Sequence, residues 1–221
     1  MSDQLVPQYL VHDTEKWGNC LSGALQVGEY IRGMVEAGFL GIHHVKVAPW
    51  QVIDGIHFLS ITLTGYKLPE AMECNGGLFA TLRGPFSRVS DELGQIYRRG
   101  VPQSINPYRA QLLNAPLYHS LFLVSETPLV LEPSDPRWLS ILPEQKPCLW
   151  KGDYALFTGP FAEVEDDDHH IFLRGIPLEI CSKTLKVLQT DAYHPHFAMI
   201  NRATGEVSST QVACSPSGGC C

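Results

Sequence analysis

Hydrophobic residues in the first 67 positions follow two different periods. In one stretch they recur at helical spacing and a glycine follows as a stop signal; these positions are Ala24, Val27, Ile31, Met34 and Val35, with Gly38 after them. A β-branched run over residues 41–47 predicts a strand, and residues 55–67 alternate apolar and polar side chains, which predicts a longer, two-faced strand. We expect residues 48–54 to be a crossing segment between the two strands.

These elements are typical of the C-terminal part of a larger α/β domain, because a two-stranded unit is only marginally stable alone. Ile31, Met34, Ile61 and Leu63 would then face a sheet and helices that this chain does not contain. We therefore expect residues 1–67 to be sensitive to proteases, or to dimerise through an exposed strand edge.

The rest of the chain contains an internal repeat. Residues 77–126 align with residues 152–201 at a constant offset of 75 and without a gap. The matches are Gly84-Pro85-Phe86 on Gly159-Pro160-Phe161, Val89 on Val164, Arg99-Gly100 on Arg174-Gly175, Tyr118-His119 on Tyr193-His194 and Phe122 on Phe197. The sequence therefore predicts a duplicated module whose two copies pack on each other. Each copy reads as two strands around a Gly-Pro break, an acidic turn, a strand, a helix and a closing strand.

The predicted fold class is α+β. Residues 1–68 would be the end of a sheet domain, residues 69–145 the first module and residues 146–205 the second. Residues 206–221 are rich in Ser, Pro and Gly and predict a flexible tail with reachable thiols, Cys214, Cys220 and Cys221.

The repeat also limits what the polar clusters can mean. The helix of the first copy is predicted to begin at Asn106-Pro107, a cap residue followed by proline. Cys181-Ser182 fills those places in the second copy, so Cys181 is either a thiolate stabilised by the helix N-terminus or an inert neighbour of a Ser182 cap. We expect residues 165–170, EDDDHH, to be a solvated hairpin turn and His194-Pro195-His196 to hold structural histidines.

Composition excludes several functions. The net charge of −7 and the absence of any Lys or Arg run give no support for binding nucleic acid. The first residues are neither basic nor apolar enough for a leader, and no stretch approaches the roughly 20 apolar residues of a membrane span. We expect a cytoplasmic protein. Seven cysteines in such a protein are typical of metal-binding or catalytic thiols.

Three stretches resemble the family of S-adenosylmethionine (SAM)-dependent arsenite methyltransferases. They are LVPQYLVHDTEKWGNCLSGALQVGEYIRGMVEAGF at residues 5–39, VIDGIHFLSITLTGYK at residues 52–67, and the terminal GGCC. The resemblance implies the end of a class I methyltransferase domain followed by the arsenic-binding C-terminal domain. It also implies that Cys20, in the Trp-Gly-x-Cys-x-x-Gly-Ala-Leu motif at residues 17–25, and Cys74 bind As(III).

The third As(III) ligand is expected to be Cys148 or a tail cysteine, because three thiolates can surround a pyramidal As(III) and soft thiolates suit a soft centre. No glycine-rich SAM loop follows a strand in this sequence, so we expect no SAM binding and no turnover by this chain alone. The family would need SAM, a thiol reductant and a separate SAM-binding half as partner. The alternatives are a non-catalytic thiol protein that sequesters or transfers As(III) or a soft metal ion, and a structural remnant without activity.

Overall fold

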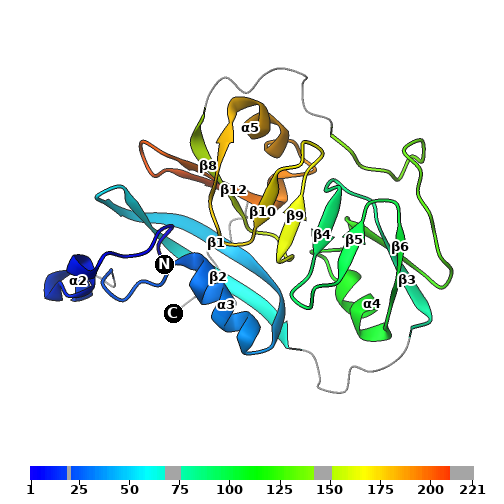
Figure 1. Ribbon diagram of the computed structural model, residues 1–221, viewed down its shortest axis with the longest axis horizontal. Helices are drawn as coiled ribbons and strands as arrows, with labels where there is room; N and C mark the ends of the chain where they lie inside the picture. Colours follow the sequence, from blue (N-terminus) through cyan, green and yellow to red (C-terminus); the bar gives the residue numbers. More distant parts are fainter. Residues whose placement is uncertain (19–20, 68–75, 142–150, 210–221) are drawn as a thin grey trace, which may run out of the picture.

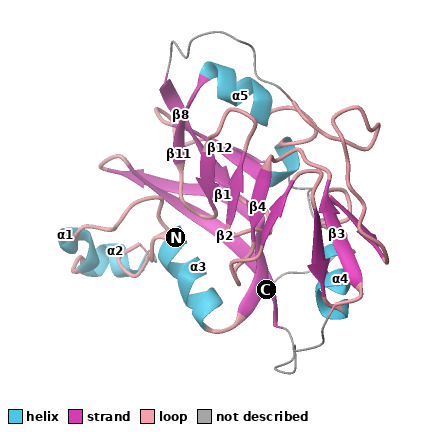
Figure 2. Ribbon diagram, turned by 45° about the vertical axis from the view of Figure 1, so that its right-hand side comes forward, coloured by secondary structure: helices cyan, strands magenta, loops and turns pink. Residues whose placement is uncertain are grey.

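The computed structural model describes residues 1–18, 21–67, 76–141 and 151–209 (Figure 1). The described part is a mixed α+β fold with several small antiparallel sheets and short helices (Figure 2). We call residues 1–67 the front segment, residues 77–126 the first copy and residues 152–201 the second copy.

The front segment is built on a long hairpin. After α1 (Gln8–Val11) and α2 (Thr14–Gly18), helix α3 (Val27–Glu36) leads through Gly38 into β1 (Phe39–Ile53), which pairs antiparallel with β2 (Ile56–Lys67). The helix and its glycine stop are as predicted. The crossing segment at residues 48–54 is wrong: these residues continue β1 to a two-residue turn at Asp54-Gly55, where both φ angles are positive. An Asp-Gly pair favours that tight turn, so the chain folds straight back.

The two copies repeat the same elements in the same order. The first contains β3 (Leu78–Leu82), β4 (Arg88–Ser90), β5 (Ile96–Arg98), β6 (Pro102–Ile105), α4 (Pro107–Leu113) and β7 (Phe122–Ser125). The second contains β8 (Lys151–Phe157), β9 (Glu163–Glu165), β10 (Ile171–Leu173), β11 (Leu178–Cys181), α5 (Ser182–Leu188), a 3-10 turn η1 (His194–His196) and β12 (Phe197–Asn201). Strand β13 (Val207–Ser209) then pairs with β12. The flexible tail was predicted to begin at residue 206, but residues 207–209 still belong to the sheet.

An approximate two-fold axis relates the copies. Strands β4 and β9 pair antiparallel with the equivalent residues Val89 and Val164 opposite each other, which joins two hairpins into one sheet of order β10-β9-β4-β5. The hydroxyl of Tyr118 donates to the Pro160 carbonyl at 3.2 Å, and that of Tyr193 donates to the Pro85 carbonyl at 2.9 Å. Each copy therefore reaches into the other at equivalent places.

One hydrophobic core runs through both copies. It includes five fully buried phenylalanines, Phe86, Phe157, Phe161, Phe172 and Phe197. Rings of the two copies meet edge to face, as Phe86 does with Tyr193 at 5.3 Å between centroids. The expectation that the modules pack on each other fits this arrangement.

The front segment is packed on the second copy, which corrects the expectation that its inward faces lack partners. Leu59 and Val47 of the hairpin are buried against Leu156, Ala198 and Ile200. Further along, Ile31 is only 5% exposed and packs with Val27 and Ile42, while Met34, Ile61 and Leu63 lie against that cluster. The hairpin's own helix α3 therefore covers one part of these faces, and the second copy covers the other, so no further sheet is needed to bury them.

Glycine makes this contact possible. Gly175 has φ +74°, and a Cβ there would lie 2.4 Å from Cδ1 of Ile31. Its equivalent Gly100 has φ +79° and is covered in the same way by the Leu131 carbonyl and the Trp138 ring. The front segment therefore covers the second copy where residues 131–138 cover the first.

Candidate functional site

Most of the expected thiol ligands lie outside the described residues. These are Cys20, Cys74 and Cys148, together with the tail cysteines Cys214, Cys220 and Cys221. The structure does describe Cys181, which is the N-cap residue of α5 and is buried, with Sγ 3.4 Å from Thr184 Oγ1. Ser182 is the first helical residue rather than the cap. Burial shields the thiol and favours the inert interpretation of Cys181.

The two residues that follow Cys20 are held firmly. Leu21 is 1% exposed, and its N–H donates to the Lys16 carbonyl at 3.1 Å. The Ser22 hydroxyl donates to the Asp13 carbonyl at 2.9 Å. Leu21 packs with Val6, Leu10 and Phe58 under the hairpin, so the Trp-Gly-x-Cys motif is anchored directly after its cysteine.

The acidic turn of the second copy is a hairpin turn, as predicted, but only part of it is solvated: the His169 side chain is exposed, whereas Asp166 and Asp167 are nearly buried. Asp166 accepts the N–H groups of Asp168 and His170, both at 2.8 Å, and so closes the turn. Asp167 forms an ion pair with Arg99 and so connects the copies. Within the described ranges, no group of three His, Cys, Asp or Glu residues could hold a metal ion.

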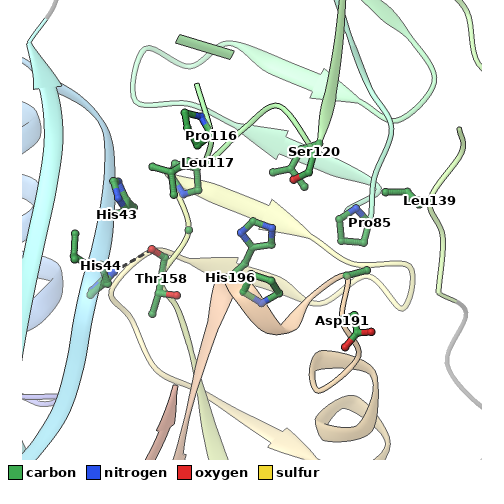
Figure 3. Close-up of a pocket in the computed structure, with 16 residues that line it drawn as sticks. His43, His44, Pro85, Pro116, Leu117, Ser120, Leu139, Thr158, Asp191 and His196 are labelled. Carbon is green, nitrogen blue, oxygen red and sulfur yellow. Dashed lines mark hydrogen bonds between the residues drawn. The ribbon is translucent and has the colours of Figure 1, made fainter. Parts of the chain in front are cut away.

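A cavity of about 460 Å³ opens where the front segment meets both copies (Figure 3). We call it the junction cavity. Pro85 and Pro160 face it as equivalent residues of the two copies, and so do Leu121 and His196. Its walls are mostly apolar, and its polar side chains are His43, His44, Ser120, Thr158, Asp191 and His196.

His196 is the most informative of these residues. Its side chain points into the middle of the close-up (Figure 3), comes from the end of η1 and is 8% exposed. Its ring is tilted against the Phe86 ring at 5.6 Å between centroids. Burial lowers the pKa of the imidazole to about 4, so the ring is neutral at physiological pH. In the described part of the chain, no protein group hydrogen-bonds to this ring.

His43 and His44 line the opposite wall, on β1. The His44 N–H donates to the Thr158 carbonyl at 2.9 Å, and Nδ1 of its ring lies 3.4 Å from the same oxygen. Burial lowers the pKa of His44 to about 3, and it also lowers that of His43, where a hydrogen bond to the Gly41 carbonyl opposes the shift. All three imidazoles are therefore neutral donors or acceptors.

The electrostatics of the junction cavity disfavour anions. None of its described lining residues is Lys or Arg, and Asp191 supplies a carboxylate. A phosphate or carboxylate ligand would lose its hydration without gaining an ion pair.

The described residues do not fit SAM. A class I methyltransferase holds the cofactor at the carboxyl ends of parallel strands, beside a glycine-rich turn. All strand ladders of the described part are antiparallel.

Sequence reasoning missed the junction cavity. His196 was read as structural because His119-Ser120-Leu121 occupies the same place in the first copy. Comparison of the two copies nevertheless singles out His196, because its equivalent in the first copy is Leu121, which is buried and apolar. The fold does not need an imidazole there, so its presence in the second copy calls for another reason.

Fold and site together define a two-copy α+β protein with a ligand-sized cavity at the junction of its copies. Two stretches, residues 77–136 and 144–219, match one family described as a domain of unknown function, DUF8838. The chain belongs to this family, and the two matched stretches contain the two copies. Curated proteins include no match to the chain. None of its described helices is long and apolar enough to cross a membrane.

Proposed function

We propose that this protein binds As(III), or a similar thiophilic metalloid, through thiolates, and presents it to a SAM-binding methyltransferase half. Cys20, Cys74 and Cys148 are the proposed ligands, and the tail thiols Cys214, Cys220 and Cys221 are auxiliary. Thiolates are the soft ligands by which proteins select soft centres. The role is binding rather than turnover, because the described residues do not fit SAM.

The observation that carries this proposal is the Trp-Gly-Asn-Cys-Leu-Ser-Gly-Ala-Leu motif at residues 17–25, which resembles the arsenite methyltransferases. Its anchoring supports the role of Cys20. Leu21, which directly follows the proposed ligand, is 1% exposed, so the chain is fixed from this residue onward.

The hairpin edge supports docking of a SAM-binding half. Residues 60–67 of β2 pair with β1 on one side, and the described part contains no strand on their other side. An open strand edge can accept a strand from a second chain. This arrangement is consistent with the end of a methyltransferase sheet.

Titration of free thiols with arsenite tests the proposal. The reduced chain should bind As(III) in roughly one-to-one stoichiometry and lose titratable thiols, and Cys20→Ser and Cys74→Ser should each weaken binding. Cys181→Ala is the matched control and should leave binding unchanged. Affinity should fall at low pH, because protons compete for the thiolates. Unchanged thiol titration in the presence of arsenite would refute the proposal.

A further inference from the structure

The junction cavity contains polar groups that the described protein leaves unsatisfied. His196 is buried, its ring has no hydrogen-bond partner among the described residues, and the equivalent residue of the first copy is the apolar Leu121. The Thr158 side chain is 6% exposed, and its hydroxyl likewise makes no hydrogen bond within the described part. Both side chains line the cavity, so their polar atoms are available to hydrogen-bond to a ligand there.

Shape and charge restrict what that ligand can be. About 460 Å³ lies within the usual range for pockets that enclose small organic molecules. Leu117, Leu139 and four prolines offer apolar contact, and the part of the lining that the structure describes has no cationic side chain to neutralise an anion. The cavity also lies at the junction of three chain parts, where small-molecule sites commonly occur.

We propose that the junction cavity binds an uncharged organic molecule, which packs an apolar ring system against the proline and leucine side chains and hydrogen-bonds to the His196 imidazole. Thr158 and Ser120 provide further hydroxyl partners from the second and the first copy. None of the described lining residues is a cysteine, so the cavity is tested separately from As(III) binding.

A matched pair of probes tests the charge and hydrogen-bond requirements. 2-Naphthamide and 2-naphthoate have nearly the same shape, but only the naphthoate is anionic. In titrations of ¹⁵N-labelled, arsenite-free protein, 2-naphthamide should shift the NMR resonances of the His196 ring nitrogens saturably. 2-Naphthoate should bind at least about tenfold more weakly than the amide. Equal binding of both probes, or no saturable shift of His196 with the amide, would overturn the proposal.

Two variants locate the binding in the cavity. His196→Leu installs the residue that the first copy tolerates, and it should weaken 2-naphthamide about five- to tenfold, as expected for one lost hydrogen bond. Ser120→Phe, at an exposed position of the wall, should block the cavity without disturbing the core. His12→Leu, an exposed histidine outside the cavity, is the control and should bind like the unchanged protein. Full affinity in both cavity variants would disprove the assignment.

Discussion

Arg174 and Glu92 form a buried ion pair that connects all three parts of the chain. Arg174 Nη1 donates to Glu92 Oε1 at 2.5 Å, and each side chain is 2% exposed. The same nitrogen donates to the Ile42 carbonyl of the front segment at 2.8 Å. The equivalent pair, Arg99 with Asp167, crosses between the copies in the other direction, and Arg99 also donates to the Leu139 carbonyl at 2.8 Å.

Removing one partner of the Arg174–Glu92 pair should destabilise the folded protein, because the remaining charge stays buried without its partner. We expect Arg174→Met to lower the free energy of unfolding by about 3 to 5 kcal/mol in urea denaturation. Arg202→Met, which removes an exposed pair with Glu179, is the control and should cost at most about 1 kcal/mol. Equal losses in the two variants would show that Arg174 is not a structural connection.

Two glycines should respond to alanine in opposite directions. Gly175→Ala should destabilise the protein by more than about 1 kcal/mol, because φ is +74° and the new Cβ would collide with Ile31. Gly33→Ala lies in the exposed interior of α3 with nothing within 4 Å and should stabilise it by about 0.5 to 1 kcal/mol. Thermal or urea unfolding of both variants measures this. A neutral Gly175→Ala would mean that the front segment does not pack on the second copy.

Acid should destabilise the protein through His196. The pKa of His196 is about 4 in the folded protein, compared with the ordinary histidine value of 6.5 in the unfolded chain. Between pH 4 and pH 6.5 the unfolded chain therefore binds a proton at this residue that the folded chain does not. The stability contribution is therefore present above pH 6.5 and is lost as the pH falls toward 4, at up to about 1.4 kcal/mol per pH unit.

The variant His196→Leu isolates this contribution. The variant keeps the other titrating groups, so their contributions cancel in the comparison. They include His44, whose pKa is lowered by burial, and His170, whose pKa is raised by its hydrogen bond to Asp166 and whose effect on stability at acid pH is opposite. Between pH 7 and pH 5, the unchanged protein should lose about 1 to 2 kcal/mol more unfolding free energy than the variant. Parallel pH profiles would show that the His196 imidazole is not buried as described.

The repeat explains why part of this fold was predictable from sequence. The constant offset predicts most elements of both copies but not the strand before each helix, β6 and β11. The Asn106 cap is confirmed by the hydrogen bond that its side chain accepts from the Arg109 N–H at 2.8 Å. The long hairpin was missed because Asp54-Gly55 was not read as a tight turn. Packing of Leu59 against Leu156 joins residues nearly a hundred positions apart, and no local pattern specifies such a contact. The junction cavity was hidden for the same reason, since three separate segments line it.

X-ray absorption at the arsenic K edge tests As(III) binding most directly. In the stoichiometric complex of the reduced chain, we predict a first shell of three sulfur atoms around arsenic, with one sulfur replaced by oxygen in Cys20→Ser. A first shell made only of oxygen, unchanged by Cys20→Ser, would contradict a thiolate site in this protein.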